Sequence, residues 1–222
     1  MERYLLLRLE LSVSVKDCHM KAFLSIKKNN KLIIKQPARS FVIAFPALLA
    51  RQFINDEDIT IQSTEGTPRT EGISSCPFYC CSPGGFGYDV QMGNNGSYGD
   101  YQPVDYCGVV IGSDNTAVDP DNYSLNTQIR SGDTTGKILY CGTSVHSLTY
   151  EDVGDTGSFK ILGIFKNISG ASIDVKEVGV YATGDAANNT YVNFCILRDV
   201  ISTISLADGE YLEVEYTISI AS

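Results

Sequence analysis

Four segments in the last third of the chain alternate apolar and polar residues with a period of two. They span residues 159–168, 173–182, 191–200 and 211–220, and β-branched and aromatic side chains fill many of their apolar positions. Successive side chains of a strand point to opposite faces of a sheet, so this pattern is typical of half-buried strands. The gaps between the segments contain Gly, Asn, Asp and Ser, which favour turns. The pattern predicts four consecutive antiparallel strands around which the rest of the chain is organised.

Shorter runs earlier in the chain show the same alternation. A polar tetrad at residues 27–30 separates two of these runs and predicts the turn of a hairpin. Gly142 interrupts the last run and predicts a β-bulge between its two halves. The runs lie at residues 4–15, 22–26, 32–34, 58–62, 107–112 and 137–150.

One segment changes to a helical period. Ser40 is placed to cap a helix over residues 39–54, and Pro46 predicts either a kink or a helix that begins there. Together the patterns predict a mainly β fold, an antiparallel β-sandwich of Greek-key or jelly-roll type with one N-terminal α-helix and one long irregular loop. Apolar residues recur at intervals of three and four at Phe41, Phe45, Leu48, Leu49 and Phe53.

Charge is divided unevenly along the chain. Residues 1–54 hold ten basic and three acidic residues, whereas the remainder holds seven basic and 23 acidic residues. We therefore expect residues 1–57 to form a basic N-terminal arm and residues 58–222 to form the β-sandwich domain. A solvated strand surface explains such an arm more simply than a specific acidic partner does. The basic residues singled out in the arm are Arg3, Arg8, Lys27, Lys28, Lys31, Lys35 and Arg39.

An irregular, Gly-rich insertion spans residues 72–106. Such a long segment without a strand or helix pattern is either functional or mobile. Its mixture of tyrosines and small residues is similar to that of binding loops, and the same tyrosines could equally pack across a subunit boundary. The candidate contact residues are Tyr79, Tyr88, Tyr98, Tyr101 and Tyr106.

Two clusters contain residue types that bind metals. Cys76, Cys80 and Cys81 offer soft ligands, but no second pair follows to complete a four-ligand zinc site. Oxygen ligands gather around Pro120, where the spacing lacks the Gly and Glu of the Ca²⁺-binding EF-hand loop. Asp and Asn are ordinary turn residues there, so we expect no metal and no cofactor. The oxygen ligands come from Asp114, Asp119, Asp121 and Asn122.

The sequence shows no motif that identifies an enzyme. Neither histidine lies in a recognisable nucleophile–base setting, and paired carboxylates for glycoside hydrolysis stay open because their separation is spatial. The apolar stretch at residues 4–9 is too short for a membrane span and is broken by Arg8, so we expect neither a signal peptide nor membrane insertion.

Glu177 and Arg198 lie within two consecutive predicted strands. If residues 183–190 form a hairpin loop, both side chains are nearly equally far from the turn. A charge-assisted hydrogen bond between them would then fix the register of the two strands. The alternative is two independent surface charges. We expect a pair with an architectural role.

Several short segments follow one another in a fixed order, at residues 38–42, 48–49, 52–53, 108–112, 123–125, 165–170, 175–181, 197–200 and 208–218. In this order they resemble a group of small structural proteins of tailed bacteriophages. The resemblance implies a part of a tail, neck, fibre or head surface, and it supplies no catalytic residues. The chain departs from the group at Pro46 and in the insertion at residues 72–106, which could be an attachment or contact device.

The resemblance leads to an expected function. It implies a repeated, non-enzymatic subunit of a phage particle, made in the host cytoplasm and located in the virion. Its partners would be copies of itself and neighbouring virion proteins, and nucleic acid is a less favoured partner. The alternative is a carbohydrate-binding or adhesin module that uses the Tyr- and Gly-rich insertion to bind a host surface glycan, although the chain has no Trp.

Overall fold

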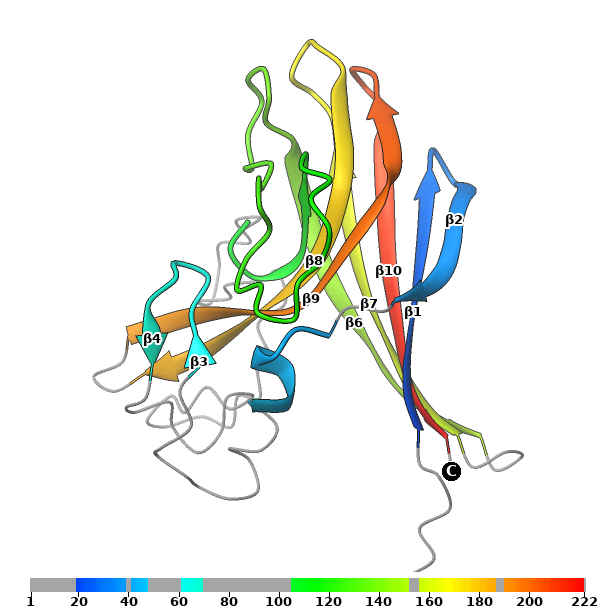
Figure 1. Ribbon diagram of the computed structural model, residues 1–222. Coiled ribbons are helices and arrows are strands. Elements are labelled where there is room, and N and C mark those ends of the chain that lie inside the picture. Colours follow the sequence, from blue (N-terminus) through cyan, green and yellow to red (C-terminus); the bar gives the residue numbers. More distant parts are fainter. Residues whose placement is uncertain are drawn as a thin grey trace, which may run out of the picture.

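Antiparallel strands make up most of the described chain. The computed structural model describes residues 19–38, 41–47, 61–69, 105–151, 156–186 and 190–221. The strands form a five-stranded sheet in the order β2-β1-β10-β7-β6, a three-stranded sheet in the order β5-β8-β9, and the small pair β3-β4 (Figure 1). The predicted mainly β, antiparallel fold is confirmed. The strands are β1 (His19–Lys28), β2 (Lys31–Ala38), β3 (Ile61–Gln62), β4 (Pro68–Arg69), β5 (Gly108–Gly112), β6 (Leu139–Glu151), β7 (Thr156–Lys166), β8 (Ile173–Ala186), β9 (Thr190–Leu206) and β10 (Tyr211–Ala221).

All four strands predicted near the end of the chain are present. β8 and β9 are longer than expected, because they form one long hairpin whose pairing runs from Ile173 and Leu206 to Ala186 and Thr190. In β6 the register shifts between Tyr140 and Gly142, and Gly142 has a φ of 121°. The predicted bulge at Gly142 is therefore confirmed.

The two larger sheets share one apolar core. Alternate residues of β1 and β10 enter it, including Leu24 and Val214, as do residues of β5 and β8. The sheets approach closely at Gly163 in β7, where an added Cβ atom would lie 2.6 Å from the Cβ of Val109 in β5. Only a residue without a side chain allows this contact.

Side chains of β6 cover the outer edge of β5. The amide of Val109 donates to Thr143 Oγ1 at 3.2 Å, and the amide of Ile111 donates to Tyr140 Oη at 3.4 Å. The Tyr140 hydroxyl in turn donates to the carbonyl oxygen of Ile129 at 2.8 Å. The unpaired backbone groups of an open strand edge can pair with another chain. These bonds engage the backbone amides of β5 that would otherwise be unpaired at its edge.

Residues 19–38 belong to the five-stranded sheet. β1 pairs with β10 along its whole length, and Ala22, Leu24 and Ile26 are buried in the common core. Asn29 and Asn30 form the β1–β2 turn with φ angles of 49° and 65°, values that suit a tight two-residue hairpin turn. From the sequence we placed these residues in an arm separate from the β domain. Their packing instead makes this hairpin part of the same body.

The helical residues described before β3 are 44–47. Phe41, which we expected inside a helix, instead forms an antiparallel bridge with Leu197 of β9. Its ring centroid lies 4.5 Å from that of Phe45. Pro46 lies within the first turn, where a missing amide hydrogen is tolerated. The other residues of the predicted helix, 39–40 and 48–54, lie outside the described residues.

Candidate functional site

Glu177 in β8 and Arg198 in β9 form a fully buried ion pair. Arg198 Nε donates to Glu177 Oε2 at 2.9 Å, and both side chains have 0% exposure. From the sequence we expected them to lie almost opposite one another. The register places Arg198 opposite Gly179 and Glu177 opposite Val200, so the two side chains are diagonal neighbours on one face of the sheet.

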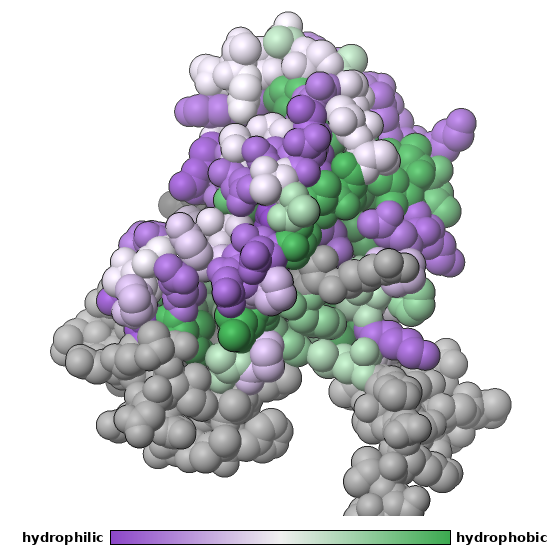
Figure 2. All heavy atoms as spheres, viewed as in Figure 1, coloured by the Kyte–Doolittle hydropathy of each residue, from purple (hydrophilic) through white to green (hydrophobic). Residues whose placement is uncertain are grey.

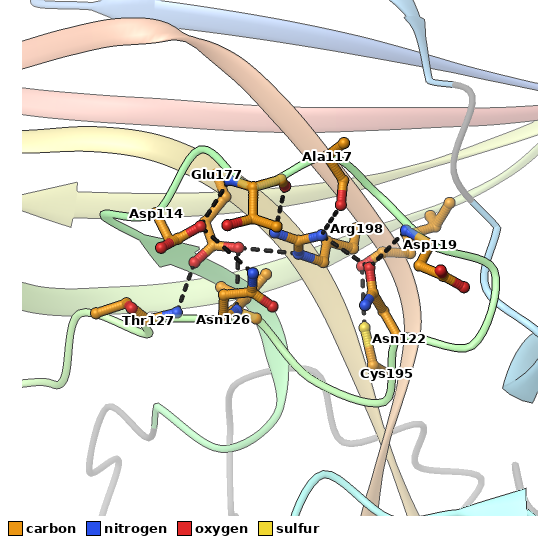
Figure 3. Close-up of polar contacts among 12 residues, drawn as sticks. Asp114, Ala117, Asp119, Asn122, Asn126, Thr127, Glu177, Cys195 and Arg198 are labelled. Atoms are coloured by element: carbon orange, nitrogen blue, oxygen red, sulfur yellow. Dashed lines mark hydrogen bonds and ion pairs between the residues drawn. The ribbon is translucent and has the colours of Figure 1, made fainter.

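The loop that follows β5 supplies the remaining partners of the arginine (Figure 3). Arg198 Nη1 donates to Asn122 Oδ1 at 2.8 Å and to the carbonyl oxygen of Ala117 at 3.4 Å. Its Nη2 donates to the carbonyl oxygen of Thr116 at 3.0 Å. A guanidinium group presents donors in a fixed planar fork, so these contacts hold the loop in one position over β9.

The same loop also supplies the remaining partners of the carboxylate. The amide of Thr127 donates to Glu177 Oε1 at 2.8 Å, and the amide of Asn126 donates to Oε2 at 3.2 Å. Gly112 makes room for this arrangement: a Cβ atom there would collide with Glu177 Oε1 and lie 2.6 Å from the Thr127 carbonyl oxygen. The pair therefore joins β8, β9 and the loop into one unit.

The oxygen ligands considered for Ca²⁺ serve as turn residues. Asp114 Oδ1 accepts from the amide of Thr116 at 2.6 Å. Hydrogen bonds from the Thr116 side chain and from its backbone amide lower the pKa of Asp114. Asp119 Oδ1 accepts from the amide of Asp121 at 2.9 Å. Asn122 Oδ1 accepts from Asp119 as well as from Arg198. The loop uses these atoms to hold its own shape.

A second buried polar contact crosses the core. The hydroxyl of Tyr216 in β10 donates to Asp199 Oδ2 in β9 at 3.1 Å, which links the five-stranded sheet to the three-stranded one. Burial raises the pKa of Tyr216, so the phenol stays protonated. Asp199 follows Arg198, and neighbouring strand residues point to opposite faces, which explains why one meets the loop and the other meets the core.

A polar cleft of about 490 Å³ lies where β8 and β9 meet two loops. Thr64 and Glu65 in the β3–β4 turn form one wall. Tyr181 and Asn193 contribute from β8 and β9, and Tyr106 contributes from the segment before β5. The loop after β5 contributes the lining residues Ser124, Leu125, Gln128 and Arg130.

Hydrogen bonds fix the orientation of two amide side chains in this cleft. Thr183 Oγ1 lies 2.7 Å from Asn193 Oδ1, so Asn193 Nδ2 keeps its donor capacity. Gln128 Nε2 donates to the carbonyl oxygen of Asp105, which leaves Gln128 Oε1 as an acceptor. The cleft can therefore offer both donors and acceptors to a polar molecule.

The structure describes only part of the sequence-predicted contact residues. Tyr106 lines the cleft. Lys27 and Lys28 form exposed ion pairs with Glu213 and Glu210, at 3.4 Å and 2.7 Å. The remaining members of both predicted sets lie outside the described residues, except Lys31 and Lys35, which are exposed on β2. Those outside are Tyr79, Tyr88, Tyr98, Tyr101, Arg3, Arg8 and Arg39.

The described cysteines differ in their surroundings. Cys195 is buried in β9, where burial raises the pKa of its thiol to about 12. Cys141 in β6 is exposed, although partial burial also raises its pKa. The three clustered residues Cys76, Cys80 and Cys81 lie outside the described residues.

Comparisons with protein families, with curated proteins and with solved structures find no match to this chain. Within the residues that the structure describes, no helix has the length and apolar character needed to span a membrane.

Proposed function

We propose that this protein is a repeated structural subunit of a tailed-phage particle, with its two larger sheets packed as a β-sandwich. The order of the sequence landmarks supports the phage assignment. The use of the buried Glu177–Arg198 pair to hold strands and loop together supports an architectural role. The observation that carries the proposal is an exposed apolar edge on the five-stranded sheet.

This edge is formed by β2. Leu32 and Ile33 are 50% and 42% exposed, and as neighbours on β2 they add to one exposed apolar patch. Among the described residues, β2 pairs only with β1, so its outer edge is left open. Figure 2 shows apolar side chains gathered at this side of the molecule, bordered by polar ones. An exposed apolar patch at a strand edge is suited to side-chain contacts with another chain. Lys31, Lys35 and Pro37 on β2 disfavour a continued strand ladder, so the contact is one between side chains.

We assign this edge to a second copy of the same chain because the charges are complementary. Lys31 and Lys35 flank the apolar residues of β2. The loop between β5 and β6 carries exposed carboxylates, including Asp119, Asp121 and Asp133, and lies on another side of the molecule (Figure 1). A contact between two different surfaces of identical copies generates a ring or a filament. Both are arrangements expected of phage structural proteins.

Sedimentation velocity at micromolar concentration tests the assembly. The wild-type chain should form oligomers at low salt and dissociate in part as salt screens the Lys–Asp attraction. Ile33→Asp should shift the population to monomer. Ile164→Asp is the matched control, because Ile164 is an exposed isoleucine on β7, inside the same sheet. This interface would be excluded if the wild-type chain were monomeric at every salt concentration, or if both variants lost the same fraction of oligomers.

Antibody labelling of purified phage particles tests the virion assignment separately. Label at regularly repeated positions in electron micrographs is the expected result. Absence of the protein from intact particles, judged by mass spectrometry of the same preparation, would overturn the assignment without affecting the oligomer measurement.

A further inference from the structure

We infer that the polar cleft between the β3–β4 turn and the loop after β5 is a binding site for an uncharged saccharide. The inference rests on the cleft alone and does not depend on the virion assignment. Its volume of about 490 Å³ lies within the range of small-molecule sites, roughly 300–1,000 Å³. Most such sites are apolar, whereas this one is lined chiefly by polar side chains, so a polar ligand fits it better.

The hydrogen-bonding groups of the cleft match hydroxyl groups. Asn193 Nδ2 can donate, because its Oδ1 is engaged by Thr183. Gln128 Oε1 can accept, because its Nε2 donates to Asp105. The carboxylate of Glu65 makes no hydrogen bond or ion pair with the other described residues and is a further acceptor. A sugar hydroxyl donates and accepts at once, so a lining that mixes both kinds of group suits it.

The charges of the cleft favour an uncharged ligand. Among the residues that the structure describes, one cation, Arg130, and one anion, Glu65, line it. Arg130 Nη1 already lies 3.5 Å from Asp105 Oδ1, so part of its positive charge is compensated. A phosphate or a carboxylate-bearing sugar would meet Glu65 without a free cluster of cations to offset the repulsion. The same argument disfavours a cationic ligand, which would meet Arg130.

An aromatic ring gives the cleft a surface for the apolar face of a sugar. Tyr106 lines the cleft with 38% of its surface exposed. Tyrosine combines a flat apolar ring with a polar hydroxyl, and it retains little conformational freedom to lose on binding. It can therefore contact the C–H groups of a sugar ring while the polar side chains bond to hydroxyls.

The walls of the cleft are held in place before any ligand binds. The amide of Thr64 donates to the Asn193 carbonyl oxygen at 2.8 Å, which ties the β3–β4 turn to β9. The amide of Leu125 donates to Tyr181 Oη at 2.7 Å, which ties the loop after β5 to β8. A site built on such fixed elements loses less conformational entropy on binding.

Saturation-transfer-difference NMR on the full chain tests the inference. The probes are glucose, galactose and N-acetylglucosamine with their β1,4-linked trimers, and 3′-sialyllactose and inorganic phosphate represent anions. At least one uncharged probe should bind. Glu65→Gln and Asn193→Asp should each weaken that binding about fivefold or more, the effect of losing one hydrogen bond. Asn193→Asp keeps the acceptor for Thr183, removes the donor and adds a negative charge to the cleft.

Asp174→Asn is the matched control, because Asp174 is an exposed acid on β8, a strand that also contributes to the cleft, but does not line the cleft. It should leave the affinity unchanged. Near-UV circular dichroism identifies any variant that fails to fold, and the other variant then carries the test. The inference is overturned if no uncharged probe binds at millimolar concentration, if all three variants behave alike, or if only the anions bind.

Discussion

At the residue scale, the strongest prediction concerns the buried charges of Glu177 and Arg198. Removing one member of the Glu177–Arg198 pair leaves the other charge buried without its partner, and such losses cost about 3–5 kcal/mol. Glu177→Gln and Arg198→Met should each lower the free energy of unfolding in urea by about this amount. The double variant should lose clearly less than the sum, because no unpaired charge remains.

The exposed pair of Lys160 and Glu215, whose charged atoms lie 3.1 Å apart, is the control for this cycle. Glu215→Gln should cost less than about 1 kcal/mol, as is usual for ion pairs in water. Strictly additive effects of Glu177→Gln and Arg198→Met would show that the two residues contribute independently.

The different surroundings of Cys195 and Cys141 predict different rates of alkylation. Burial raises the pKa of Cys195 to about 12, and the thiolate is the reactive form of cysteine. In the folded protein, iodoacetamide should therefore leave Cys195 unmodified between pH 7 and pH 10, while it labels the exposed Cys141. Mass spectrometry after timed quenching measures both. Rapid labelling of Cys195 in the native state would contradict its burial, and labelling in 6 M guanidinium chloride is the positive control.

At the scale of elements, the β1–β2 turn is a local test of hairpin geometry. Asn30 has a φ of 65°, in the left-handed region that Asn and Gly tolerate and β-branched residues do not. Asn30→Gly should be close to neutral. Asn30→Val should cost about 1–2 kcal/mol and lower the melting temperature by about 2–8 °C. Asn29 stays unchanged, since its Oδ1 accepts from the amide of Tyr211 at 3.1 Å.

A scanning calorimeter gives both melting temperatures for this comparison. Equal values for Asn30→Gly and Asn30→Val would mean that the turn does not require a left-handed conformation at this position.

The sequence pattern found the strands but not their full length or their surroundings. The alternation of apolar and polar residues located β7 and β10, because each strand has one buried face and one face toward solvent. It was less informative for β9, where Arg198 and Asp199 are both buried because the loop covers one face and the other sheet covers the second. The helix pattern at Phe41 failed because tertiary pairing with Leu197 overrides a local period.

At the candidate sites, too, the sequence predicts some of the residues and not others. Glu177 and Arg198 could be selected from the sequence, since they are charges within apolar strands. Their loop partners could not, because backbone groups such as the Thr116 carbonyl carry no sequence signal. The polar cleft went unnoticed because its residues come from separate segments, and neither spacing nor periodicity connects Glu65 with Asn193.

At the scale of the whole molecule, the β1–β2 hairpin connects folding and assembly. Its turn docks on the β9–β10 turn, where Lys28 Nζ lies 2.7 Å from Glu210 Oε2 and Asn29 Nδ2 donates to Glu210 Oε1 at 3.0 Å. These bonds lower the pKa of Glu210, led by the one from Lys28. One face of the hairpin thus belongs to the core, whereas its outer edge is the proposed interface.

Two leucines of this hairpin separate these roles. Leu24 is fully buried in the core and Leu32 is half exposed at the β2 edge. Leu24→Ala should destabilise the monomer by about 2–5 kcal/mol, because it removes buried contacts and leaves a cavity. It should do so within a single unfolding transition, since β1 shares its core with both sheets.

Leu32→Ala should change the free energy of unfolding by no more than about 0.5 kcal/mol, as surface substitutions usually do, and should weaken oligomers in sedimentation velocity. Chemical denaturation at submicromolar concentration measures the free energy of unfolding of the monomer without a contribution from oligomers. A separate early transition in Leu24→Ala would show that residues 19–38 fold as an independent arm, and a Leu32→Ala chain that assembles like the wild type would remove this edge from the interface.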